Sequence, residues 1–135
     1  MALIKWSQVL SVGVASLDAQ HQRLFQMFDD LNEAMLRGKD REAIGEIIDG
    51  LIEYAQEHFV REEKLFAQTA YRDAAAHKLE HDAFIRKASQ LKEEHLGGKD
   101  GVSLQALDFM SAWLQEHICG TDKKYTAHLN SRGIK

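Results

Sequence analysis

The sequence predicts an all-α fold, an up-down-up-down four-helix bundle with an irregular N-terminal arm and a short C-terminal tail helix. Three observations support this prediction. Apolar residues recur at alternating three- and four-residue steps, which places them on one face of a helix. Four such stretches follow one another with short connections, as in an antiparallel bundle. The 135 residues contain no proline, the residue that interrupts helices most strongly.

Capping residues and glycines set the boundaries of the predicted elements. Ser16 and Asp40 are the predicted N-caps of the first two helices. Gly38, Gly97 and Gly120 follow the ends of the first, third and fourth helices. No repeat or linker divides the chain, so residues 1–135 are predicted to form a single domain. The predicted elements are an arm over 1–15, helices over 16–38, 40–66, 73–96 and 103–119, and a tail helix that extends to Leu129.

The composition excludes several classes of protein. A hydrophobic fraction of 44% and a charged fraction of 28% exclude a disordered or membrane-spanning chain. Because 17 Lys and Arg face 21 Asp and Glu, a nucleic-acid partner is not expected. The single Cys excludes a disulfide framework, and the N-terminus lacks the apolar stretch of a signal peptide. We therefore expect a cytoplasmic protein, monomeric and without a membrane partner.

Ionisable side chains occupy positions of the apolar helix faces where leucine or isoleucine is expected. Burying them is costly unless something compensates their polar atoms. In antiparallel order all of them lie within about 12 Å of one end of the bundle. Imidazoles and a carboxylate, without a thiolate, suit a first-row metal such as iron, manganese or zinc. The residues concerned are His21, His58, Glu62, His77, His81 and His117.

Two pairs at i,i+4 spacing, His58 with Glu62 and His77 with His81, each place two donors on one helix face. Two other metal chemistries fit the pattern less well. Carboxylate-rich di-iron proteins use Glu-x-x-His pairs, and the sequence contains none. The second pair formally matches the H-x-x-E-H motif of zinc proteases. Its Glu80, however, is predicted to face away from the ligands toward solvent.

Four segments resemble the hemerythrin family in its bacterial form. They are Trp6 followed by SVGVASLDAQH (11–21), HFVREEKLF (58–66), YRDAAAHKLEHDAF (71–84) and WLQEHICGTDKKY (113–125). The resemblance covers nearly the whole chain and adds one acidic residue to the candidate ligands. It implies one iron bound by His77, His81 and His117, a second bound by His21 and His58, and two bridging carboxylates, Glu62 and Asp122.

The resemblance also implies a cofactor and a function. The cofactor is two Fe ions, Fe2+ or Fe3+, with a bridging oxo or hydroxo group. Three histidines on one iron and two on the other leave one coordination position open, where O2 binds end-on. The implied function is reversible O2 binding, not catalysis, for carriage, storage or delivery to an oxygen-consuming enzyme. The alternatives are an O2-sensing module of a larger signalling protein and a di-iron enzyme with peroxidase or nitric-oxide-handling activity.

Residues beside the candidate ligands give further expectations. Cys119 is predicted to be a small buried hydrophobic residue, and His95 and His128 to be surface or helix-end residues. His117 and Asp122 diverge by about 140° on a regular helix, so we predict a break or bulge over 119–121. Six apolar residues are expected to form the wall of the O2 pocket within the core: Leu24, Phe25, Phe59, Trp113, Leu114 and Ile118.

Overall fold

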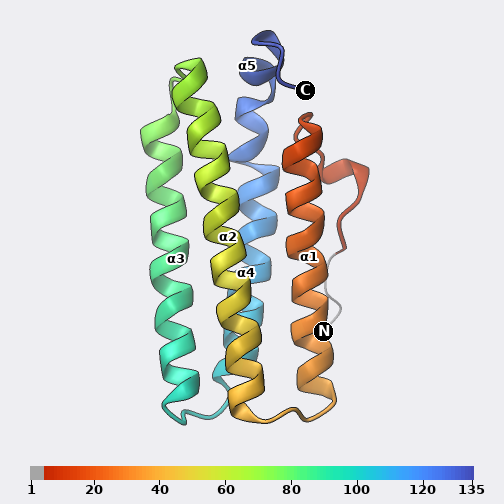
Figure 1. The fold of residues 1–135 in the computed structure, drawn as a ribbon, viewed down its shortest axis with the longest axis vertical. Coiled ribbons are helices and arrows are strands. Elements are labelled where there is room, and N and C mark those ends of the chain that lie inside the picture. The colour runs from red at the N-terminus through yellow and green to blue at the C-terminus, as the bar shows by residue number, and fades with distance from the viewer. Residues whose placement is uncertain (1–4) are drawn as a thin grey trace.

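The computed structural model describes residues 5–135, and the predicted four-helix bundle is confirmed (Figure 1). The four long helices alternate in direction, with a short 3-10 helix, η1, in the arm before them and two short elements after them. The first four residues of the predicted arm lie outside the described residues. No strand occurs in residues 5–135. The elements are η1 (Gln8–Leu10), α1 (Ala15–Leu36), α2 (Arg41–Thr69), α3 (Ala74–Leu96), α4 (Val102–Cys119), η2 (Asp122–Tyr125) and α5 (Thr126–Ser131).

The start of α1 differs from the prediction. Its N-cap is Val14, which has no side chain that could cap the helix, and Ser16 lies inside the first turn. The acidic group in this turn is Asp18, whose Oδ1 accepts a 2.8 Å hydrogen bond from the Val12 amide. The side chain that ties this helix start to the arm is therefore Asp18, three residues inside the helix.

The other helix ends lie within three residues of the prediction. Asp40 is confirmed as the N-cap of α2, because its Oδ1 accepts a 2.8 Å hydrogen bond from the Ala43 amide. The helix extends to Thr69 instead of Phe66, and the next residue, Ala70, is in the left-handed conformation with φ 53°. The fourth helix begins at 102 instead of 103. Glycine is the usual residue in a left-handed helix end, so its absence explains why the predicted end of α2 is too early.

Apolar side chains fill the bundle over most of its length. Burial of each such side chain contributes about 1.5–3 kcal/mol of transfer free energy. The inward-facing positions of each helix form its seam. In the half of the bundle near the loops 37–40 and 97–101, five apolar seam residues are each 4% exposed or less: Leu31, Ile48, Leu51, Leu91 and Leu107.

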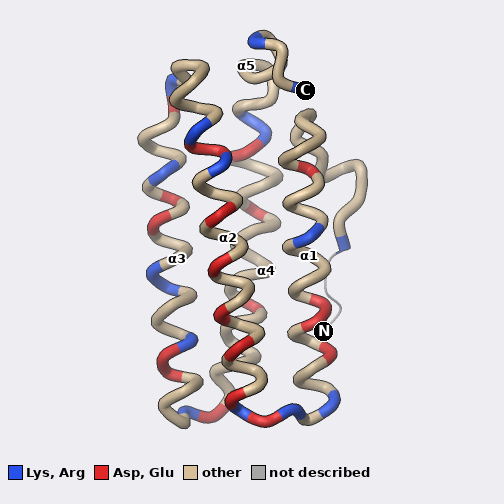
Figure 2. Tube along the Cα trace, in the orientation of Figure 1, with Lys and Arg blue, Asp and Glu red and all other residues tan. Residues whose placement is uncertain are grey.

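Charged residues lie on the outer faces of the helices (Figure 2). Four acidic residues follow one another along the exposed side of α2: Glu42, Glu46, Glu53 and Glu57. An acidic face repels phosphate backbones. None of the helices in residues 5–135 has the length and apolar character needed to span a membrane.

One prediction about a single side chain is wrong: Cys119, expected to be buried, is exposed at the last residue of α4. His95 is a helix-end residue, as predicted, in the last turn of α3. It is buried, and its Nε2 donates a 2.8 Å hydrogen bond to the carbonyl oxygen of Arg41. His128 is a partly buried helix-end residue whose Nε2 lies 2.9 Å from the Thr69 carbonyl oxygen. Backbone carbonyls at the two ends of α2 thus bind the two histidines that are not candidate ligands.

Candidate metal centre

The seven candidate ligands come together at one end of the bundle. Each is 3% exposed or less. Their ligand atoms form two groups, and within each group all atoms lie within 4.8 Å of one another. The three-histidine group consists of His77, His81 and His117 with Glu62 and Asp122, and the two-histidine group consists of His21 and His58 with the same two carboxylates.

The two oxygens of Glu62 face different groups. Its Oε1 lies 3.1 Å from Nε2 of His81 and 3.5 Å from Nε2 of His77. Its Oε2 lies 3.5 Å from Nε2 of His58 and 3.9 Å from Nε2 of His21. This carboxylate therefore spans the space between the two groups.

Asp122 divides its oxygens in the same way. Its Oδ1 is 3.0 Å from Nε2 of both His77 and His117. Its Oδ2 is 3.3 Å from Nε2 of His21. Two carboxylates that each face both histidine groups are suited to bridge a pair of metal ions.

The spacing of the imidazole nitrogens fits metal binding. Nε2 of His21 lies 2.9 Å from Nε2 of His58, and Nε2 of His117 lies 3.1 Å from Nε2 of His77. Two nitrogens at about 2.1 Å from one divalent ion, at right angles, lie about 3 Å apart. Several buried ligand atoms have no hydrogen-bond partner: Glu62 Oε1, His81 Nε2, Asp122 Oδ1 and Asp122 Oδ2. Unpartnered buried acceptors are costly, and metal ions would satisfy them.

The electrostatics keep both carboxylates charged. Burial disfavours the charged form of Glu62, but His58, His77 and His81 hold its pKa well below the usual range. Burial and the charge of Glu62 likewise oppose ionisation of Asp122, and the adjacent imidazoles of His117, His21 and His77 nevertheless lower its pKa. Burial disfavours protonated His77, whereas the two carboxylates raise its pKa to about 9. Without metal, a proton on His77 supplies positive charge that metal ions would otherwise supply.

Three histidines have their outer nitrogen fixed by a side chain that the sequence analysis did not identify. A hydrogen bond at Nδ1 orients the ring and leaves Nε2 free for a metal. Each acceptor stands next in sequence to a ligand on one helix and bonds to a ligand on another helix. This adjacency is a signal that could have been used. The pairs are Gln20 with His58 at 2.7 Å, Glu63 with His81 at 2.8 Å and Glu80 with His117 at 3.2 Å.

The position of Glu80 corrects the expectation that it faces only solvent. Its side chain is 45% exposed, yet Oε1 accepts hydrogen bonds from His117 Nδ1 and from the Thr121 hydroxyl at 2.9 Å. The carboxylate therefore lies on the outer side of the ligand rings. The zinc-protease alternative needs this glutamate beside the metal, so the geometry does not support it.

The predicted break after His117 is confirmed. The helix α4 ends at Cys119, Gly120 has φ −99° and ψ −71°, and η2 begins at Asp122. The change of direction brings His117 and Asp122 within hydrogen-bond distance of each other, at 3.0 Å, although a regular helix would separate them by about 140°.

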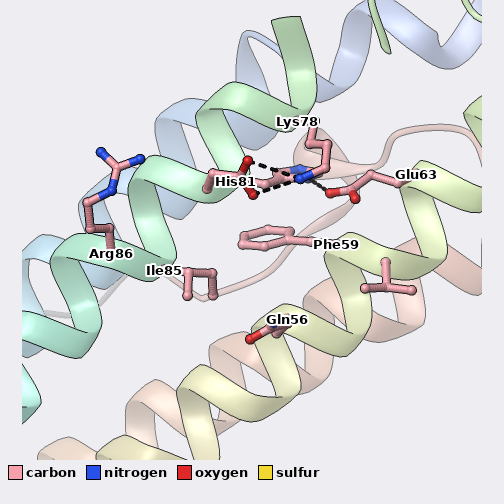
Figure 3. A pocket seen from close by; sticks show the side chains of 9 residues that line it. Gln56, Phe59, Glu63, Lys78, His81, Ile85 and Arg86 are labelled. Carbon is pink, nitrogen blue, oxygen red and sulfur yellow. Dashed lines mark hydrogen bonds and ion pairs between the residues drawn. The ribbon is translucent and has the colours of Figure 1, made fainter. Parts of the chain in front are cut away.

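Aromatic rings cover the three-histidine group. Phe59 stacks on His81 with ring centroids 3.9 Å apart, and Trp113 stacks on His117 at 4.4 Å. Figure 3 shows Phe59 beside His81, at a groove of about 470 Å³ between α2 and α3. Phe59 also lies 5.8 Å from His58. These two aromatic residues thus contact ligands of the three-histidine group, whereas the open position was expected at the other group.

The remaining candidate pocket residues are buried apolar side chains, each 4% exposed or less: Leu24, Phe25, Leu114 and Ile118. Their role as a pocket wall remains a prediction. One further polar contact belongs to the site. The Tyr125 hydroxyl donates a 2.7 Å hydrogen bond to Glu62 Oε2, and burial together with both carboxylates raises the pKa of Tyr125 well above its usual value. The hydroxyl therefore stays protonated and orients Glu62.

Comparisons with known proteins agree with this geometry. The model of the Hemerythrin HHE cation binding domain matches residues 12–129. The chain is 36% identical to the bacteriohemerythrin of Stenotrophomonas maltophilia, covering 96% of this chain and 86% of that protein. It is 30% identical to the myohemerythrin of Theromyzon tessulatum, covering 93% and 92%. A crystal structure of wild-type hemerythrin matches with a TM-score of 0.87 at 33% identity, covering 95% and 98%. The chain therefore belongs to the hemerythrin family.

Proposed function

We propose that this chain binds O2 reversibly at a pair of irons joined by an oxo or hydroxo bridge. The observation that carries the proposal is that the two donor groups share both carboxylates but contain different numbers of histidines, three in one group and two in the other. Three imidazoles and two carboxylate oxygens would hold one ion, and with a solvent bridge they would fill six positions. Two imidazoles, two oxygens and the bridge would fill five positions at the other ion. The two-histidine group therefore has room for one more ligand.

The donor set favours binding over oxidation chemistry. An iron pair held here would supply the electrons that O2 takes up on binding and returns on release. Five imidazoles and two carboxylates donate less negative charge than the carboxylate-rich sites of di-iron oxidation enzymes. Imidazole donors of this kind favour the ferrous state and hence release of intact O2. We therefore propose a binding protein for oxygen carriage, storage or delivery.

The chain's own residues hold the site dry and fixed. All seven ligands are buried, and the hydroxyl of Tyr125 donates to the Glu62 oxygen that faces the two-histidine group. We assign Leu24, Phe25, Leu114 and Ile118 to the apolar wall of the open position, where they would exclude water. Excluding water and protons from a bound ligand slows its irreversible loss.

Metal analysis and optical spectra test the proposal. We expect two irons per chain in protein produced with ample iron, and absorption bands that appear in air and disappear when O2 is removed. About one zinc per chain would contradict the di-iron assignment. An irreversible ferric product with turnover of an added reductant would favour the enzyme alternative instead.

A pair of variants tests whether the reversible bands depend on the candidate metal site or are lost when any buried histidine is removed. His58→Ala removes a ligand of the two-histidine group and should abolish the reversible bands. His95→Ala removes another buried histidine, which binds a backbone carbonyl at the opposite end, and should keep both irons and the bands. Equal loss in both variants would mean that the bands report folding only.

A further inference from the structure

The N-terminal arm is bonded directly to the segment that carries Asp122. Three side chains of this segment donate hydrogen bonds to three carbonyl oxygens of the arm. They are Lys123 to Val9 at 2.5 Å, Thr126 to Val12 at 2.6 Å and Asn130 to Gly13 at 3.0 Å. The contacts therefore begin one residue after the bridging carboxylate and continue into α5.

The arm is itself fixed at this place. Val12 and Val14 are 0% and 1% exposed, and Asp18 of α1 accepts hydrogen bonds from the Val12 amide and the Ser11 hydroxyl. Gly13 has φ +72°, and a Cβ at this position would lie 2.7 Å from the Thr126 methyl group. Arm and segment thus pack too closely for a side chain between them.

The segment has little structure of its own. After the break at Gly120 it consists of η2, with 4 residues, and α5, with 6 residues. Helices this short are not stable alone in water. Its position depends on contacts with other elements: Thr121 to Glu80, Tyr125 to Glu62, His128 to the Thr69 carbonyl and the three bonds to the arm.

We propose that the arm is a clamp that positions Asp122 at the metal pair, with Thr126 as the central positioning residue. The inference rests on the proposed function in taking Asp122 as a bridge between two irons. Thr126 carries the middle bond of the clamp and lies four residues after Asp122. Loss of this bond frees the segment to move and weakens the hold of Asp122 on the metals.

Iron release from the full-length protein tests the clamp. The reduced protein is mixed anaerobically with an excess of a ferrous chelator, and the rate of iron transfer is followed. Thr126→Val replaces the hydroxyl with a methyl group of similar size and leaves the Val12 carbonyl unpaired. We expect release about fivefold faster than in the unaltered protein. Thr126→Ser keeps the hydroxyl and should restore the rate to within about twofold.

A control variant at the loop end of the bundle, near residues 37–40 and 97–101, distinguishes the loss of Asp122 positioning from a general loss of protein stability. His95→Phe removes a similar side-chain-to-backbone bond, between His95 and Arg41, and should lower the thermal midpoint without changing iron release. An unchanged rate in Thr126→Val, or equal acceleration in His95→Phe, would overturn the clamp.

Amide hydrogen exchange on the protein as purified gives a readout that does not depend on which metal is bound. In Thr126→Val, exchange should rise over residues 121–130 and stay unchanged in α2 and α3. Unchanged exchange over 121–130 would overturn the clamp. The proposed function, by contrast, fails if the unaltered protein lacks two irons, whatever the exchange result.

Discussion

The two ends of the bundle differ in the side chains at their inward-facing seam positions, which are apolar at one end and ionisable at the other. At the loop end, near residues 37–40 and 97–101, the seam is apolar and its buried histidine, His95, is paired with a backbone carbonyl. At the opposite end, called here the metal end, the seven buried candidate ligands occupy the space, and several of their atoms have no hydrogen-bond partner. The elements η2 and α5 lie at this end, and the arm runs along α1 from the middle of the bundle to the same end (Figure 1).

The difference shows where the stability of the fold comes from. Apolar side chains at the loop end stabilise the bundle without any ligand. The metal end buries charges that cost several kcal/mol each unless they are paired. Metal ions held by the candidate ligands would offset that cost, so we expect metal binding and folding to be coupled at this end and independent at the other.

Glu62→Ala should produce the largest effect, because it removes a bridge from both groups at once. We expect loss of at least one iron per chain and metal affinity at least about 100-fold lower. Metal analysis after dialysis measures the iron that remains bound per chain. Glu57→Ala, on the exposed side of the same helix, is the control and should keep both irons.

Leu51→Ala tests how much the apolar core at the loop end contributes to the stability of the fold. Leu51 is 0% exposed, and removing its side chain should lower the free energy of unfolding by about 2–5 kcal/mol. Denaturant unfolding measures the loss, and iron content should stay at two per chain. A parallel fall in iron content would show that the two ends are not independent.

The metal-free protein should have a pH dependence that the metal-bound protein lacks. The pKa of His77 is raised from 6.5 to about 9 by the carboxylates, so its protonated form stabilises the fold. This contribution is complete below pH 6.5 and is lost as the pH rises through 9. Metal ions replace the proton. Urea unfolding at pH 6.5 and pH 9, with and without a chelator, checks the difference. Equal stability of the metal-free protein at both values would contradict it.

Leu114→Ala tests whether an apolar side chain at the metal end excludes water from the O2 pocket. Leu114 is 1% exposed and lies three residues before His117. A smaller side chain should admit water, and we expect decay of the O2-bound form in air to become several-fold faster. Iron content should not change. An unchanged decay rate would remove Leu114 from the pocket wall.

The sequence was informative where side chains follow helical periodicity. The 3-4 spacing predicted all four helices and placed His21, His58, His77 and His81 on inward faces, because helix geometry alone determines which positions share a face. Asp122 could not be found in this way, since it follows a helix break, and only the family resemblance identified it as a ligand.

Contacts between helices were not predictable from periodicity. Gln20, Glu63 and Glu80 lie beside the seam, and their roles depend on which helices are neighbours and at what register. The bonds from the arm to α5 join residues separated by more than 100 positions. Neither local propensity nor spacing encodes such a pairing, so the arm was described only as irregular.

The stacking of Trp113 on His117 gives the protein an internal fluorescence reporter. The chain has two tryptophans. Trp113 lies 4.4 Å from a ligand ring, so iron in the three-histidine group should quench its emission. Trp6 lies on the arm, in a hollow lined by Gln22 and Phe25 of α1, and its emission should follow displacement of the arm. Replacing Trp6 with phenylalanine leaves Trp113 to report metal occupancy, and replacing Trp113 with phenylalanine leaves Trp6 to report movement of the arm.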